Sequence, residues 1–399
     1  MGHKYNFDAV INRRDTGCLK VDALEERFGR GDIQAMWIAD MDFAVAPTII
    51  NALTERLSHP ILGYPCLCEE YVNSIISWAS RRHRLAIERE ELSFIPGVVK
   101  GIAYAINYFT RPGEGVIIQP PVYHPFKMVI EGNQRRAVVN PLEYDSEKMR
   151  YSMNLGHLEE CMSDPTVNMM ILCNPHNPSG IQWDKETLQA VASLARENGV
   201  TVVSDEIHGD LMLWGKEHLP FLKVSEDASQ VGIMLAAPSK TFNIPGLVSS
   251  WMVIKNPALR DSFYRWMESN EFNDPMLMAM VATRAAYNEA EDWLDELTEY
   301  IQENIISVER LISEELPGGE LRSMRPDASF LGWLDFTRLG LEQRDLVSLI
   351  IDRAGLALND GEMFGTEGRG FMRLNVASPR AVLLEAVGKI INAVKTVVK

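Results

Sequence analysis

Residues 232–243 read Gly-Ile-Met-Leu-Ala-Ala-Pro-Ser-Lys-Thr-Phe-Asn. The first five form a short apolar run that is typical of a buried strand, and Pro238 then begins a turn. Lys240 follows directly, so it is placed to enter the crevice at the carboxyl ends of parallel strands. A lysine that loses water there has a lowered pKa and attacks aldehydes. An exposed loop lysine is the alternative for this tripeptide taken alone.

Similar apolar runs alternate with amphipathic stretches over the first two thirds of the chain. Each run is bounded by Gly, Pro, Asn or Ser, as strands are. The alternation predicts an α/β fold with a mainly parallel sheet. The expected strands are Val116–Gln119, Met169–Cys173, Val200–Ser204, Gly232–Ala236 and Trp251–Ile254, and the expected helices are Pro47–Leu57, Glu69–Arg82 and Lys185–Glu197.

The pattern changes after about Pro275, where a long helical stretch continues to Leu311. A strand at Ser329–Phe336, a helix at Glu342–Ala354 and a strand at Gly370–Val376 follow, and these no longer form a simple alternating series. Ser378 is a candidate N-cap for the last helix. We therefore expect a large domain at 48–288 and a smaller α+β domain built from 1–47 and 289–399.

Composition excludes several classes of function. The 399 residues carry a net charge of -16, which argues against nucleic acid and anionic membrane surfaces as partners. No uncharged apolar run approaches the ~20 residues of a membrane span. The first residues lack the apolar core of a secretory signal, and the five cysteines fit reduced thiols, so we expect a cytoplasmic protein. Cys66 and Cys68 have no partner pair elsewhere, and no metal site is expected.

Two further strand ends carry polar side chains. Asp205 follows the run at 200–203 and could pair with a pyridinium nitrogen in the crevice. A helix N-cap, or a metal site with Glu206 and His208, are the alternatives for this segment. Asn174 opens the stretch Asn-Pro-His-Asn-Pro-Ser-Gly after another strand, and its amide either donates into the cleft or only shapes a turn.

A fourth segment begins at Gly97 and leads into the apolar stretch Ile102–Phe109. A glycine before a helix start presents free N–H groups to an anion, although this segment matches neither common glycine fingerprint. In order, the strand ends therefore carry an anion loop, Asn174, Asp205 and Lys240. Together these groups would bind a phosphorylated pyridine aldehyde.

At this point the chain resembles a known family. It is similar over nearly its whole length to fold-type-I pyridoxal-phosphate (PLP) enzymes of the class I/II aminotransferase group, and more narrowly to the MalY/PatB-type C–S lyases, the cystalysin-like cystathionine β-lyases. This resemblance implies the PLP-dependent transferase fold, with a large domain around a mainly parallel seven-stranded sheet. The narrow match rests on 37–43 (Trp-Ile-Ala-Asp-Met-Asp-Phe), Gly63-Tyr64, 121–123, 173–180, 204–208, 238–243 and 371–375.

The resemblance implies a role for each residue around the cofactor. Lys240 would bind PLP covalently and move the Cα proton, and Asp205 would keep the ring nitrogen protonated. Asn174 would hydrogen-bond the ring hydroxyl with His208 behind it, and Tyr123, counted with Lys240 and Asp205 as catalytic, would stack on the ring. The phosphate would be held by the backbone of Val98 and Val99 and by the Ser239 hydroxyl.

The remaining implied roles concern the substrate and a second subunit. Arg373 would bind the substrate α-carboxylate with help from the backbone of Ala39. Tyr64 would reach the phosphate of a neighbouring subunit, which implies a homodimer with shared active sites. Many aminotransferases of this group have an arginine near Val248, and its absence favours the lyase branch. His124 either lines the substrate pocket or faces solvent.

Three functions follow as hypotheses. The first is a PLP-dependent C–S β-lyase that cleaves L-cystathionine or related S-substituted cysteines to a thiol, pyruvate and ammonia. The second is a PLP-dependent aminotransferase, because both reactions use the same groups up to loss of the Cα proton. The third adds a regulatory protein-binding role to the same fold. The cleft is expected to be locally positive despite the acidic surface, since it receives a phosphate and a carboxylate.

Overall fold

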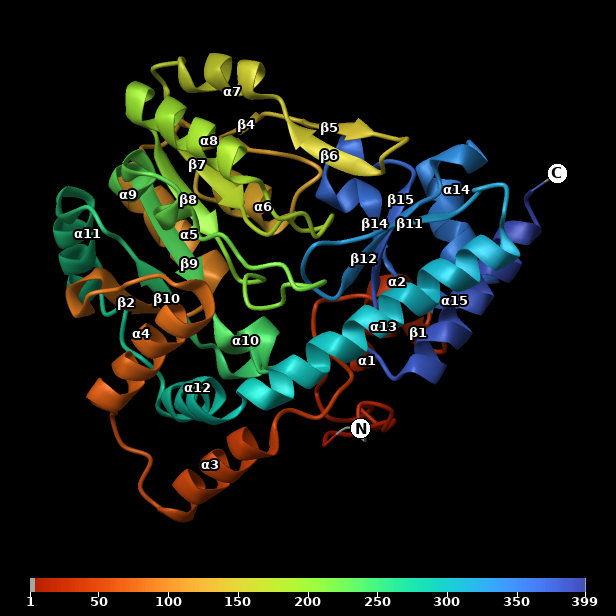
Figure 1. The fold of residues 1–399 in the computed structure, drawn as a ribbon, viewed down its shortest axis with the longest axis horizontal. Helices are drawn as coiled ribbons and strands as arrows, with labels where there is room; N and C mark the ends of the chain where they lie inside the picture. The colour runs from red at the N-terminus through yellow and green to blue at the C-terminus, as the bar shows by residue number, and fades with distance from the viewer. Residues whose placement is uncertain (1–3, 399) are drawn as a thin grey trace.

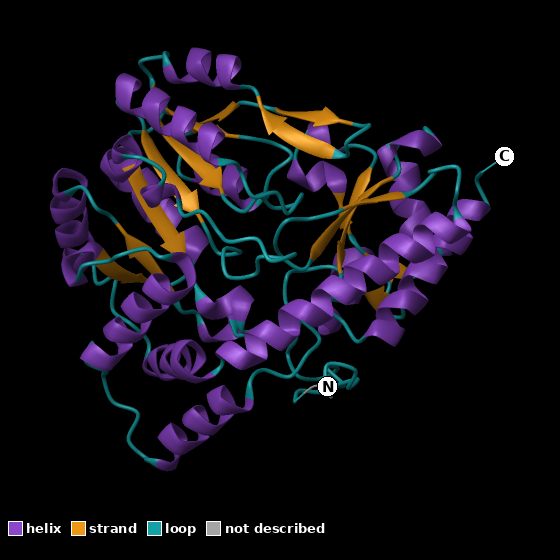
Figure 2. Cartoon of the chain, viewed as in Figure 1, coloured by secondary structure: helices purple, strands orange, loops and turns teal. Residues whose placement is uncertain are grey.

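A seven-stranded sheet forms the left half of the molecule in the computed structural model, which describes residues 4–398 (Figures 1 and 2). Its strand order is β2-β10-β9-β8-β7-β3-β4, and only β10 runs antiparallel to its neighbours. The predicted α/β fold with a mainly parallel sheet is confirmed. The strands are β2 (Leu92–Ile95), β3 (Gly115–Ile118), β4 (Arg136–Val139), β7 (Val167–Cys173), β8 (Thr201–Asp205), β9 (Gly232–Ala236) and β10 (Ser250–Val253).

Helices cover both faces of this sheet, which explains why its central strands are apolar throughout. Met169 and Ile171 of β7 pack against α5 (Val98–Phe109), α6 (Pro125–Gly132) and α11 (Pro257–Ser269). Met170 and Leu172, which alternate with them, join the core under α7, α8 and α9 on the opposite face. The ranges of these three helices are Leu155–Met162, Lys185–Asn198 and Glu226–Val231.

A smaller, antiparallel sheet lies near the other end of the molecule, in the order β11-β12-β15-β14. The strands are β11 (Arg322–Met324), β12 (Leu331–Asp335), β14 (Asn359–Asp360) and β15 (Phe371–Asn375). The long helix α13 (Glu291–Glu315) runs from the large sheet to this one, where it packs beside α15 (Arg380–Lys395) (Figure 1). The structure therefore has two main sheets, and α13 extends from one to the other.

The N-terminal segment packs with the C-terminal elements. β1 (Gln34–Ala35) pairs in parallel with β13 (Leu356–Ala357), so a red segment near the start of the chain lies beside blue C-terminal elements in Figure 1. The domain limits 48–288 and 1–47 plus 289–399 stay a prediction, and their positions 1–3 and 399 lie outside the described residues. The other elements are α1 (Leu19–Asp22), α2 (Leu24–Phe28), α3 (Pro47–Ser58), α4 (Glu69–His83), β5 (Leu142–Asp145), β6 (Arg150–Met153), α10 (Pro238–Thr241), α12 (Leu277–Glu289) and α14 (Gln343–Ser348).

The expected N-cap of the last helix is wrong. α15 begins at Arg380, and the Ser378 hydroxyl has no hydrogen-bond partner among the described residues. Contacts from α13 replace the cap: the Tyr300 hydroxyl accepts the Arg380 N–H at 2.8 Å, and the Asn304 amide donates to the Ser378 carbonyl at 2.9 Å. Tertiary partners thus fix a helix start that local sequence assigned to serine.

Within residues 4–398, no helix is long and apolar enough to cross a membrane. The same part of the chain holds no cluster of three or more His, Cys, Asp or Glu side chains arranged to bind a metal ion.

The packing between the two main sheets depends on the buried face of α13. One substitution can test this packing. Leu297→Ala removes a fully buried side chain from the core, whereas Ile306→Ala on the same helix changes a side chain that is 46% exposed. We expect Leu297→Ala to lower the free energy of unfolding by about 2–5 kcal/mol, and Ile306→Ala by less than about 1 kcal/mol. Denaturant unfolding of the two variants compares them, and equal losses would contradict this packing.

Candidate active site

Four strand ends of the large sheet converge on one cavity of about 310 Å³. Asp205 ends β8 and lies beside Cys173, the last residue of β7, while Lys240 follows β9 in the short helix α10. Gly97 follows β2 at the same edge. The predicted site residues that line the cavity are Ala39, Val98, Val99, Tyr123, Asp205, His208, Ser239 and Lys240.

Lys240 lies in a setting that favours its neutral amine. Burial lowers the pKa of Lys240 to about 8, and the nearby charge of Arg373 acts in the same direction, while Asp40 and Asp205 oppose it. Its Nζ donates a hydrogen bond to the Ala39 carbonyl at 2.5 Å. The lowered pKa gives Lys240 a much larger neutral fraction near neutral pH than an exposed lysine has, and the neutral amine is the form that attacks an aldehyde.

Asp205 is a buried carboxyl group without an ion-pair partner among the described residues. It is 4% exposed, and burial raises the pKa of Asp205 to about 7. Its Oδ1 accepts one hydrogen bond, from the Ile207 backbone N–H at 3.1 Å. A cationic ring nitrogen placed against this group would stabilise the carboxylate, because an opposite charge lowers a carboxyl pKa.

The far end of the cavity is suited to an anion. Gly97 precedes α5 with φ of +113°, a conformation that side chains other than glycine rarely adopt, and no side chain caps the helix. The first-turn N–H groups at Val98 and Val99 therefore have no intrahelical acceptor. Ser239, Val248 and Ser249 line the same cavity. This donor set fits a phosphate group.

Arg373 is a buried cation that faces amides instead of carboxylates. It lies on β15, is 3% exposed, and burial lowers the pKa of Arg373 to about 10. Its Nη1 donates to Asn177 Oδ1 at 2.9 Å and its Nη2 to Asn359 Oδ1 at 2.7 Å. Within residues 4–398 no carboxylate forms an ion pair with it, so a substrate carboxylate would supply the missing charge.

The expected position of the Asn174 amide in the cleft is wrong. Asn174 is fully buried, its Nδ2 donates to the Leu219 carbonyl at 3.0 Å, and its Oδ1 accepts from Gln182 Nε2 at 2.8 Å. Asn177 lines the cavity instead and joins it to Arg373. Sequence reasoning missed Asn177, although the second Asn-Pro step of the same motif was a visible signal.

His208 and Tyr123 complete the wall of the cavity. Burial lowers the pKa of His208 to about 3, so its ring is neutral, and its Nδ1 lies 3.1 Å from Ser329 Oγ. The Tyr123 N–H donates to the Asn177 carbonyl at 3.1 Å. Tyr64 is fully exposed and does not line this cavity, and His124 lines a neighbouring one.

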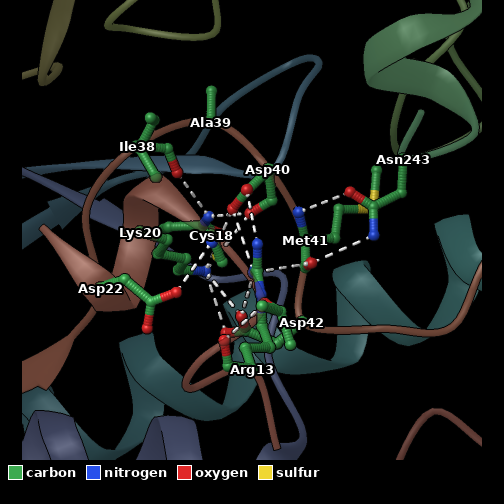
Figure 3. Close-up of polar contacts among 12 residues, drawn as sticks. Arg13, Cys18, Lys20, Asp22, Ile38, Ala39, Asp40, Met41, Asp42 and Asn243 are labelled. Carbon is green, nitrogen blue, oxygen red and sulfur yellow. Dashed lines mark hydrogen bonds and ion pairs between the residues drawn. The ribbon is translucent and has the colours of Figure 1, made fainter. Parts of the chain in front are cut away.

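The Ala39 carbonyl of the loop 38–43 accepts the Lys240 amine, and two asparagines bind the backbone of this loop. Figure 3 shows one of them, Asn243, beside Met41. Asn243 accepts the Met41 N–H at 2.9 Å and donates to the carbonyls of Met41 and Phe43 at 3.0 and 2.9 Å. Asn375 donates to the carbonyls of Ile38 and Asp40 at 2.8 and 2.6 Å. The loop is thereby tied to the segments that carry Lys240 and Arg373.

Ion pairs from the N-terminal segment hold the same loop from its other side. Figure 3 shows Arg13 between Asp40 and Asp42, with contacts of 2.6 and 2.7 Å. The Lys20 side chain, 1% exposed, reaches Asp42 at 2.9 Å. Sequence reasoning did not find this cluster, since Arg13 and Lys20 have no motif of their own.

The comparisons with known proteins agree with this architecture. Residues 38–390 match the family described as aminotransferase class I and II. Cystathionine beta-lyase PatB of Bacillus subtilis is 42% identical over 96% of this chain and 98% of its own length. Protein MalY of Escherichia coli is 35% identical over 98% and 100%. The crystal structure of cystalysin from Treponema denticola superposes with a TM-score of 0.92 at 31% identity, covering 98% of this chain and 99% of that one.

The family match spans both sheets and the elements that carry Lys240 and Arg373, and the similarity to PatB and MalY extends over nearly the whole chain. The protein therefore belongs to the aminotransferase class I and II family, in the branch that contains PatB and MalY.

Proposed function

We propose that the protein is a PLP-dependent C–S β-lyase that cleaves L-cystathionine or related S-substituted cysteines. The observation that carries the proposal is geometric: the Lys240 amine and the buried Asp205 carboxyl group line one cavity, and Asn177 in the wall of that cavity accepts a hydrogen bond from the buried Arg373. Near full-length similarity to PatB, named a cystathionine beta-lyase, supports the choice of reaction. The balanced reaction converts the thioether and water to a thiol, pyruvate and ammonia.

The residues of the cavity fit PLP, the cofactor that the cystalysin structure contains. Lys240 would bind its aldehyde covalently, and Asp205 would pair with its ring nitrogen. The first-turn N–H groups of α5 and the Ser239 hydroxyl suit the phosphate. Tyr123 suits the ring face, and His208 with Asn177, in place of Asn174, suits the ring hydroxyl.

The chain's own groups then act on the substrate in defined positions. Arg373 binds the α-carboxylate through its two guanidinium N–H pairs and so orients Cα. Lys240, as a free neutral amine, takes the proton from Cα. Bound PLP would supply the electron sink that makes this proton acidic. The Asp205 carboxylate would lie beside the ring nitrogen and keep it protonated, which the sink requires. The electron pair left at Cα expels the thiolate from Cβ.

Tyr64 is the basis for proposing a homodimer with shared active sites. It lies between α3 and α4, away from its own cavity, and the neighbouring Ile61, Leu62 and Leu67 are 67%, 62% and 47% exposed. Contiguous exposed apolar side chains of this kind are typical of an interface. In such a dimer Tyr64 of one subunit reaches the phosphate of the other.

The five unpaired cysteines support a cytoplasmic location.

The reaction itself is tested with L-cystathionine and L-alanine. We expect the holoenzyme to release thiol and pyruvate from L-cystathionine in equal amounts, because the β-substituent leaves once Cα has lost its proton. L-alanine, which has no leaving group, should leave the cofactor spectrum unchanged over the same time. Absence of thiol from every cysteine thioether tried would overturn the lyase, and stoichiometric formation of pyridoxamine phosphate from L-alanine would favour an aminotransferase.

The role of Arg373 predicts the effect of a conservative change. Arg373→Lys keeps the charge but loses the planar fork, so we expect KM for L-cystathionine to rise about 10- to 100-fold with a smaller change in kcat. The matched control is Arg369→Lys, since Arg369 is exposed and pairs with Glu362 on the surface. Steady-state kinetics of both variants test the assignment, which fails if Arg373→Lys behaves like its control.

Shared active sites predict that two inactive variants restore each other. Lys240→Ala and Tyr64→Ala, refolded together, should form mixed dimers in which one of the two sites has both residues. If subunits pair at random, activity recovers to about a quarter of the wild-type level. Mixing the variants without subunit exchange is the control. No recovery in mixed dimers isolated by two affinity tags would contradict the contribution of Tyr64 across the interface.

A further inference from the structure

A second cavity, of about 480 Å³, lies beside the proposed active site. One wall is formed by Tyr123, His124 and one side of α6, and the other by residues 362–367 of the segment 361–368 before β15. We call it the side cavity. None of the roles assigned above to the catalytic groups uses it.

The side cavity shares its wall with the active site. Tyr123 lines both cavities. Phe364, which lines the side cavity and is 2% exposed, lies under the Arg373 guanidinium at 4.9 Å, and its carbonyl accepts the Val122 N–H at 2.8 Å. A substrate held at Arg373 by its carboxylate is thus one side chain away from this space.

The chemistry of the side cavity combines an apolar wall with charges of both signs. Phe364 and Met128 offer surface suited to methylene groups and a sulfur atom. Lys127 and Glu131 face each other loosely at 3.8 Å, and the side chain of each is more than half exposed. Glu367 receives a single hydrogen bond from the described residues, from the Thr366 hydroxyl at 3.3 Å. Both charges are therefore available to a ligand.

His124 adds a polar atom that lacks a partner. Its Nδ1 is buried and makes no hydrogen bond among the described residues. Burial lowers the pKa of His124 to about 4, and the Arg373 charge adds to the effect, so the ring is neutral. A buried polar atom without a partner costs free energy, which a ligand group could relieve.

We propose that the side cavity receives the sulfur-bound substituent of the substrate and recognises an ammonium and a carboxylate at its far end. The inference rests on the proposed C–S lyase function and assigns the residues that bind the distal amino-acid part of L-cystathionine. Phe364 and Met128 contact the methylene chain, Lys127 binds the distal carboxylate, and Glu367 binds the distal ammonium. Simple alkyl thioethers make neither of the two charged contacts, so these contacts favour the amino-acid substituent over an alkyl group.

The test compares two substrates of the same shape. S-isopentyl-L-cysteine replaces the distal ammonium and carboxylate of L-cystathionine by methyl groups. Pyruvate release by the holoenzyme gives kcat/KM for each, and we expect L-cystathionine to be preferred. Lys127→Met and Glu367→Gln should each lower the ratio of kcat/KM for L-cystathionine to kcat/KM for S-isopentyl-L-cysteine about tenfold, which is the usual size for one charged hydrogen bond. We expect the change to arise from a higher KM for L-cystathionine.

The matched control is Lys148→Met, because Lys148 is also an exposed lysine in a local ion pair but lies outside the side cavity. It should leave the ratio at the wild-type value, and circular dichroism verifies the fold of all three variants. If both thioethers are cleaved and neither Lys127→Met nor Glu367→Gln changes the ratio, the side cavity is not the substituent site and the lyase stands. If neither of these two thioethers is cleaved but another cysteine thioether is, the inference is wrong and the lyase stands, whereas cleavage of no thioether overturns both.

Discussion

The side chains of Asn243 and Asn375 hydrogen-bond the backbone of the loop 38–43, and the geometry of the site depends on these hydrogen bonds. Asn243 lies three residues after Lys240, and Asn375 lies two residues after Arg373. Their amides bind backbone groups of the same loop, whose Ala39 carbonyl accepts the Lys240 amine. Lys240 follows a strand of the large sheet, whereas Arg373 lies on a strand of the small sheet. The same short loop contacts the segments that carry both residues.

The site maintains charges in a setting where burial disfavours them. Asp205 and Arg373 are almost fully enclosed, and neither has an ion-pair partner among the residues described. Burying a charge without a partner opposes folding, whereas a cationic ring and a carboxylate would supply the missing partners. Such perturbed groups gather at functional sites, since stability is sacrificed there for chemistry. The surrounding apolar core, continuous under both sheets, offsets this cost.

Much of the fold could be predicted because its signals are local. The apolar runs of β8 and β9 and the residues directly after them are contiguous in sequence, so Asp205 and Lys240 could be placed at strand ends. β2 and β4 were not located, because Ser93 interrupts the apolar run of β2 and because β4 is only partly buried, whereas β3 and β10 have the same length but are buried throughout. Asn174 was assigned to the cleft and Asn177 was overlooked because the two Asn-Pro steps look alike. Only the contacts of Asn174 with Gln182 and Leu219 separate them.

The sequence by itself determined which reactive groups exist and which strand ends carry them, because short-range periodicity and turn residues encode both. The tertiary structure alone decided how those groups behave. The pKa of Lys240 and the partners of Arg373 arise from burial by segments far apart in the chain, and the Arg13 cluster joins residues without a common motif. The side cavity likewise forms only where α6 meets the segment 361–368. Local sequence patterns do not predict contacts between distant segments, because each such contact depends on how the whole chain packs.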